Sequence, residues 1–224
     1  MKIPINLVTL FALLCQIVIA APDKTDGAAL QERTALLDAR VRGAEAIRAI
    51  KRLQYAYGHY AEFGLWNDLA DLFADKGVGH YPAGNLGKEE IRKLFLQDVG
   101  KGRLGLDQGR LYPHIMFQPV VTLAPDGKKA NGRFRVLALL GGYGEQAIWA
   151  GGIYENEYIL ENGVWKFTSM VLDYIWTADY KGGWAHIDPN AKGVVAAPFP
   201  KIIDEPFHYK NPITGRKPPN YVGD

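Results

Sequence analysis

Long apolar runs separated by turn signals fill residues 111–176, and this alternation limits the possible folds more than any other feature. The runs are Leu111–Ala124, Gly132–Leu140, Ala147–Glu161 and Val164–Trp176. Their branched and aromatic residues favour strands, and Pro125-Asp126-Gly127 is a typical turn sequence. Asn162-Gly163 is the strongest hairpin signal, because this pair tolerates the positive φ angles of a type I′ turn. The second half of the chain therefore predicts a meander of long strands.

The first half has the pattern of helices. Ala28–Phe63 contains no proline, and its apolar residues recur every three or four positions. The expected buried stripe consists of Leu30, Leu37, Val41, Ile47, Ile50 and Tyr57. We expect Gly43 to divide this stretch into a leading helix and a main helix, and Gly64 to end it. Shorter helices are predicted over Trp66–Phe73 and Lys88–Gln97. Helices followed by strands predict an α+β fold, with the helices packed against one face of a curved antiparallel sheet.

Residues 1–21 have the layout of a cleaved signal peptide. Lys2 precedes an apolar run from Ile5 to Ala20, which ends in small residues. The run is shorter than the ~20 apolar residues of a membrane span, so we expect no stable membrane insertion after cleavage. An uncleaved anchor is the alternative. Cys15 is the only cysteine and would leave with the signal, so the mature protein would have no disulfide. The sequence predicts an exported protein, either periplasmic or secreted.

The remainder divides into three segments. Residues 22–43 are expected to form a leading helix, residues 44–180 a single α+β domain, and residues 181–224 an extended tail. Prolines interrupt the tail at Pro189, Pro198, Pro200, Pro206, Pro212, Pro218 and Pro219. Such a segment is expected to lie on the domain or to make a subunit contact.

Charge and motif content exclude several classes of function. The formal net charge is +2 with acids and bases interspersed, so no basic stripe predicts a nucleic-acid partner. The histidines are His59, His80, His114, His186 and His208, and their spacing is not that of metal ligands. Gly141-Gly142-Tyr143-Gly144 is a hairpin turn rather than a phosphate loop. We therefore predict neither a metal nor a cofactor.

Several motifs carry a resemblance to a known family. These are IKRLQYAYGHYAEFGLWNDLADLF, VGHYPAG, GKEEIRKLF, PHIMFQPVV, NGRFRV and ENGVWKF. Over residues 44–180 they resemble the SnoaL-like branch of the nuclear-transport-factor-2-like superfamily. The resemblance implies an α+β cone, in which a bent sheet wraps around a helix and leaves one apolar pocket. It also implies a homo-oligomer, either a dimer or a trimer.

Within that superfamily the chain resembles scytalone dehydratase and the bile-acid 7α-dehydratase. Those enzymes eliminate water from a hydroxylated ring without a metal or an organic cofactor. The resemblance implies that His114 is a general acid/base, that Glu62 orients it, and that Tyr57 and Tyr81 polarise a substrate oxygen. The chain also departs from those enzymes: Glu62 replaces an aspartate, Leu140 a second histidine, and Gly152 and Tyr154 a pocket serine and asparagine, while an aspartate aligns near Ala138.

Each implied role has a plainer alternative. His114 shares a strand face with Met116 and Gln118, and it is either a proton-transfer group or a structural histidine bonded to the backbone. Tyr57 is either a site phenol or a core aromatic. Glu62 follows Tyr57 by five residues, which places the two side chains about 140° apart around a helix. They converge only if the helix loosens near a glycine, and otherwise Glu62 is an exposed residue at the helix end.

Abundant aromatic residues favour a flat, apolar ligand. The residues expected to line the substrate pocket are Tyr154, Trp149, Met116 and Leu140. The predicted function is a cofactor-independent lyase or isomerase, acting by dehydratase-like proton transfer on a small hydrophobic cyclic substrate. One alternative is a non-catalytic protein that binds an apolar small molecule. Another is a structural module whose aromatic residues fill the cone.

Overall fold

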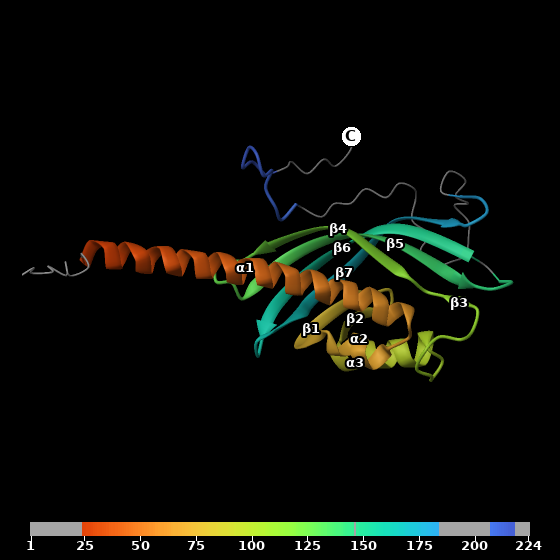
Figure 1. Cartoon of the computed structure of the whole chain (residues 1–224). Helices are drawn as coiled ribbons and strands as arrows, with labels where there is room; N and C mark the ends of the chain where they lie inside the picture. The colour runs from red at the N-terminus through yellow and green to blue at the C-terminus, as the bar shows by residue number, and fades with distance from the viewer. Residues whose placement is uncertain (1–23, 146, 184–206, 218–224) are drawn as a thin grey trace, which may run out of the picture. The chain divides into compact units, whose positions relative to one another are not determined.

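The computed structural model describes residues 24–145, 147–183 and 207–217 (Figure 1). The expected signal peptide, His186 and most of the tail prolines lie outside these described residues. The chain divides into two compact units between Val41 and Arg42. No helix in the described part of the chain is both long and apolar enough to cross a membrane.

The observed elements depart from the predicted order of helices and then strands at one point, because two strands lie between the second and the third helix. The helices are α1 (Lys24–Glu62), α2 (Trp66–Asp71) and α3 (Lys88–Leu94), which continues into the π-helical turn η1 (Phe95–Val99). The strands are β1 (Phe73–Tyr81), β2 (Gly84–Gly87), β3 (Arg110–Leu111), β4 (His114–Leu123), β5 (Lys129–Gly142), β6 (Ala147–Glu161) and β7 (Val164–Asp179). The predicted strand over residues 147–161 has the observed bounds, whereas β1 and β2 lie outside the four predicted apolar runs.

The strands form one strongly curled, mixed sheet. Its order is β2-β1-β7-β6-β5-β3, and β4 also pairs with β5 (Figure 1). Strands β4 to β7 form the predicted antiparallel meander, and Asn162 and Gly163 both have positive φ at the last hairpin, as a type I′ turn requires. The prediction of a wholly antiparallel sheet is wrong, because β1 pairs with β7 in parallel. A parallel neighbour arrives through a crossover connection rather than a local turn, so hairpin signals do not reveal it.

Helix α1 corrects two predictions. It runs unbroken through Gly43, because one glycine costs a helix only about 1 kcal/mol and does not end it. The expected buried stripe also contains two different faces: Leu30 and Leu37 are exposed, whereas Ile50 and Tyr57 are buried. At about 100° per residue, Leu30 and Ile50 differ by about 200° around a helix and cannot share a face. Gly64 ends the helix with φ +67°, as predicted.

The core lies on the concave side of the sheet, where the second half of α1, α2 and α3 pack. Its largest fully buried side chains include Trp66, Phe73, Phe134, Tyr154 and Phe167. Phe167 is central, since its ring contacts those of Tyr57, Phe73 and Tyr158 at centroid distances of 6.0, 5.2 and 5.2 Å. The α+β cone predicted from the sequence is confirmed.

A bulge in β4 changes the face on which one predicted neighbour of His114 lies. The pairing of β4 with β5 shifts between Phe117 and Val120, and Gln118 has φ +50°. The bulge interrupts the strict alternation of side chains. The Gln118 amide oxygen accepts a hydrogen bond from Arg135 Nε at 3.1 Å, on the outer face of the sheet. The prediction that Gln118 shares the face of His114 and Met116 is therefore wrong.

The described part of the tail contacts the outer face of the sheet. The Arg133 guanidinium lies over the Phe207 ring, 4.5 Å from its centroid, and His208 Nδ1 is 3.1 Å from the Thr122 hydroxyl oxygen. Arg133 also forms an ion pair with Glu155. Phe207 and His208 therefore lie against β5 and β4.

Candidate active site

Five elements bring tyrosine side chains and one histidine together on the concave side of the sheet. The residues are Tyr57 from α1, Tyr81 from β1, Tyr112 before β4, His114 from β4, Tyr154 from β6 and Tyr174 from β7. The Tyr57 and Tyr81 hydroxyl oxygens lie 3.3 Å apart, within hydrogen-bonding distance. We call this set the phenol cluster. The sequence reasoning identified four of these six positions.

The register of the sheet explains why the strand residues of the cluster share a face. His114 is opposite Ala138, Tyr154 is opposite Phe134, and both of these β5 residues are buried. Tyr174 in β7 is opposite Gly152 in β6, and Gly152 precedes Tyr154 by two residues on the same strand. Because side chains alternate along a strand, these positions all point towards the helices.

His114 is held by the backbone next to it. Its Nδ1 lies 3.2 Å from the Tyr112 carbonyl oxygen, and the two rings are 5.0 Å apart at 53°. Since a carbonyl oxygen only accepts, Nδ1 carries the proton of this hydrogen bond and Nε2 keeps its lone pair. Burial lowers the pKa of His114 to about 4, against the opposing effect of the Tyr112 carbonyl. The imidazole is therefore neutral at pH 7 and can accept a proton at Nε2.

The phenols are kept protonated by their surroundings. Burial raises the pKa of Tyr57 above its usual value of 10, although the Tyr81 hydroxyl lowers it in part. Burial also raises the pKa of Tyr81 and Tyr154, and neighbouring phenols raise it further, because two adjacent phenolates would repel. Neutral phenols can donate hydrogen bonds to a carbonyl or an alkoxide oxygen. The cluster therefore combines hydrogen-bond donors with one neutral base.

Glu62 does not join the cluster. Its carboxylate lies 3.8 Å from His59 Nδ1, one turn earlier on the same helix, and it is half-buried at the helix end. Helix α1 stays regular through Tyr57, Gly58 and Glu62, so the angular separation expected from the sequence is retained. Among the described residues, no hydrogen bond or ion pair joins Glu62 to His114. A role for Glu62 in orienting His114 would require a different arrangement.

The residues expected to line a substrate pocket separate into two groups. Tyr154, Met116 and Leu140 belong to the concave face of the sheet, as their register in β4–β6 requires. Trp149 lies on the opposite face, because its register partners are Leu139 and Ala178. Its ring packs against that of Trp176, with centroids 5.3 Å apart.

Tyr112 and Tyr174 were missed by the sequence reasoning. The Tyr112 ring packs against that of His114, with centroids 5.0 Å apart, and its phenol adds to the burial that raises the pKa of Tyr57 and Tyr174. A signal existed for Tyr112, since it is two residues before His114 and a strand period of two places both on one face. No local signal of this kind existed for Tyr174, because its place opposite Gly152 depends on the register between β6 and β7.

A buried amide network fixes α1 beside the cluster. Gln54 and Asn156 are fully buried, and Asn156 Nδ2 donates to Gln54 Oε1 at 2.6 Å. The Tyr158 hydroxyl donates to the same oxygen at 3.1 Å, and Gln54 Nε2 is 3.6 Å from the Met116 sulfur. Buried polar groups are costly unless they are paired, so this network specifies one position of α1 on the sheet.

Gly58 allows α1 to approach β4 closely. A Cβ atom at this position would lie 2.7 Å from the His114 carbonyl oxygen, which is backbone and cannot swing away. The glycine thus sets the distance between the helix that carries Tyr57 and the strand that carries His114.

Replacing Gly58 by Ala should therefore destabilise the protein. We expect a loss of about 1–3 kcal/mol from overpacking, reduced by the better helix propensity of alanine. Urea unfolding followed by circular dichroism measures this loss. Gly27→Ala is the matched control, because Gly27 lies in the same helix with nothing within 4 Å of the added methyl. An equal response of the two variants would contradict the close approach at Gly58.

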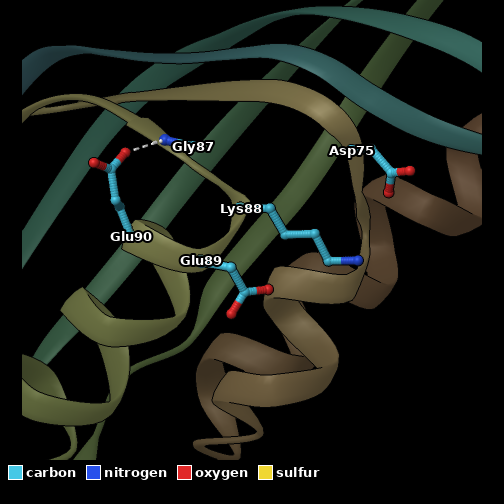
Figure 2. Close-up of a pocket in the computed structure, with 5 residues that line it drawn as sticks. All are labelled: Asp75, Gly87, Lys88, Glu89 and Glu90. Carbon is cyan, nitrogen blue, oxygen red and sulfur yellow. Dashed lines mark hydrogen bonds between the residues drawn. The ribbon is translucent and has the colours of Figure 1, made fainter.

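An open surface depression of about 400 Å³ lies elsewhere, beside β1 and α3 (Figure 2). It is lined by Asp75, Gly87, Lys88, Glu89 and Glu90. The Gly87 amide donates to the Glu90 carboxylate at 2.7 Å, and Lys88 Nζ lies 3.2 Å from Asp71. These charges have partners on the protein and suit an apolar ligand poorly. In residues 24–145, 147–183 and 207–217, no group of three acidic, His or Cys side chains could hold a metal ion.

Comparison with known proteins identifies the family. A family model described as a SnoaL-like domain matches residues 42–171, which is more than half of the chain. Comparison with curated proteins gave no match.

Solved structures with the same fold are distant in sequence. A proposed scytalone dehydratase from Novosphingobium aromaticivorans is 23% identical, with a TM-score of 0.55 over 63% of this chain and 91% of that one. The hexachlorocyclohexane dehydrochlorinase LinA-type3 from Novosphingobium barchaimii is 20% identical, with a TM-score of 0.55 over 64% and 95% of the two chains. At such identities the likeness shows the fold alone.

Proposed function

The chain belongs to the family of SnoaL-like domains, and from this premise we propose that it is a cofactor-independent lyase or isomerase for a small hydrophobic cyclic molecule. One observation carries the proposal. The imidazole of His114 is neutral, with Nδ1 held by the Tyr112 carbonyl oxygen, and it lies in a cluster of protonated phenols. A base beside hydrogen-bond donors is the minimum needed to move a proton on carbon.

The proposed elimination needs only these groups. His114 Nε2 takes a proton from a carbon next to a ring carbonyl, and the electron pair of that C–H bond moves onto the carbonyl oxygen. The paired hydroxyls of Tyr57 and Tyr81 donate hydrogen bonds to the resulting enolate oxygen. The enolate reforms the carbonyl as the bond to the β-hydroxyl breaks, and the imidazolium gives its proton to that oxygen. Water leaves and His114 is neutral again. Returning the proton to a different carbon would make the same site an isomerase.

The surroundings of His114 favour a neutral ring as substrate. The cluster consists of aromatic side chains that are uncharged at pH 7, since burial raises the pKa of Tyr81, Tyr112 and Tyr154. Met116 adds an apolar surface beside them. A cyclic ketone bearing a β-hydroxyl or a β-chloride meets these demands, and the relatives named as a dehydratase and a dehydrochlorinase are consistent with either leaving group.

A non-catalytic binding protein is the second candidate. Its supporting observation is that Glu62 is paired with His59, which leaves His114 without a carboxylate from that helix end. An imidazole whose pKa is about 4 is also a weak base. A binding protein would retain a ring molecule without changing it.

Incubation with a panel of small rings tests the proposal. The panel holds cyclic β-hydroxy ketones, their β-chloro analogues and hexachlorocyclohexane, with products identified by mass spectrometry. We expect loss of water or chloride from at least one member. Tyr57→Phe should slow that reaction by roughly 10–100-fold, because the enolate oxygen loses one donor. Tyr60→Phe is the control, since that tyrosine lies on the same helix outside the cluster. Binding without any product would favour the second candidate.

A further inference from the structure

The first part of α1 carries an exposed apolar stripe. Leu30, Leu37 and Val41 have exposed fractions of 65%, 49% and 56%, and none of them belongs to the hydrophobic core. Thr34 falls between them, so the spacing along Leu30, Thr34, Leu37 and Val41 is four, three and four residues. At about 100° per residue these four side chains lie within about 60° around the helix. Alternating steps of four and three residues are the spacing of the a and d positions of a heptad repeat.

Charged residues flank this seam in a consistent order. With Thr34 and Val41 at the a positions of a heptad and Leu30 and Leu37 at the d positions, Arg33 and Arg40 fall at g, and Asp38 and Glu45 fall at e. In a parallel coiled coil the g position of one helix faces the e position of the next heptad on its partner. The facing pairs are therefore Arg33 with Asp38 and Arg40 with Glu45, all of opposite charge.

We propose that the N-terminal part of α1 pairs with the same segment of a second copy as a short parallel coiled coil. The occupant of the exposed seam is the identical seam of that copy, with Leu37 packed against Leu37. The charge order selects the direction, since antiparallel pairing would place Arg33 and Arg40 against the arginines of the partner. The coil would hold two copies of the domain by their leading helices.

Sedimentation equilibrium of the full chain tests this proposal. We expect the wild-type protein to be a reversible dimer. Leu37→Asp should raise its dissociation constant by about tenfold or more, because it puts a charge into the seam. Leu36→Asp is the matched control, because Leu36 is adjacent, 60% exposed and outside the seam. It should stay within about twofold of wild type.

Charge reversal then tests the direction of the helices. Arg33→Glu with Arg40→Glu places like charges opposite Asp38 and Glu45 in a parallel pair and should weaken the dimer. Adding Asp38→Arg and Glu45→Arg should restore it. A wild-type protein that stays monomeric at about 100 µM would overturn the proposal. A dimer that tolerates Leu37→Asp, that responds equally to Leu36→Asp, or that ignores the charge reversal would also overturn it.

Discussion

Replacing His114 by Gln should lower turnover of the active panel compound by about 10²–10⁴-fold, because glutamine keeps a polar group but cannot take up a proton. The Michaelis constant should change much less, since the ring contacts of the phenol cluster remain. Steady-state kinetics of the wild type and the variant measure the two effects, on the turnover number and on the Michaelis constant, separately. His80→Gln is the control: His80 bonds to Asn85 and Ser169, at 2.8 and 3.2 Å, away from the cluster. Equal turnover by His114→Gln and wild type would remove His114 from the mechanism.

Both the rate and the stability of the wild-type protein should depend on pH through His114. The rate should rise as pH increases through about 4, where His114 loses its proton, and then stay level. Stability should fall as pH drops from about 6.5 towards 4. The sign follows because unfolded histidine takes up a proton in this window, whereas His114 in the folded protein, with its lowered pKa, does not. His208, whose pKa burial also lowers to about 4, adds to this loss. His114→Gln should therefore lose less stability on acidification than wild type.

Replacing Phe167 by Ala should destabilise the protein by about 3–5 kcal/mol, because it removes a fully buried ring and leaves a cavity. The ring contacts Tyr57, Phe73 and Tyr158, so the cavity would open between α1 and two strands. For a domain of this size we expect the melting temperature to fall by roughly 6–20 °C. Thermal unfolding followed by circular dichroism measures the change.

Phe63→Ala is the matched control for this prediction. Phe63 follows α1 directly and is 60% exposed, so its truncation should cost less than about 0.5 kcal/mol. Comparable losses of stability in the two variants would contradict the burial of Phe167 in the core.

Local patterns predicted the local elements well. The hairpin at Asn162-Gly163 and the end of α1 at Gly64 depend on backbone angles that these residues tolerate, and the structure has both. The strand over residues 147–161 follows from an apolar run bounded by turns. Positions of Tyr57 and His114 came from the family resemblance, and the structure places both on the concave side of the sheet.

Contacts between distant segments decided the rest. Whether Leu30 or Ile50 is the buried residue of α1 depends on which face of the helix meets the sheet, and both faces are apolar in the sequence. The partner of Glu62 is His59 rather than His114 because α1 stays regular to its end. The bulge at Gln118 depends on pairing with β5.

The sequence alone determined the class of fold, the positions of the helices and of the long strands, and the family, because these follow from periodicity, turn residues and motifs within short windows. Only the tertiary structure decided which side chains surround His114. Tyr112 and Tyr174 are 62 residues apart in the chain, yet burial and the neighbouring Tyr112 phenol together raise the pKa of Tyr174, because the curled sheet brings β7 near the start of β4. Such proximity depends on how the sheet curls and on strand register, and neither is encoded by any single segment.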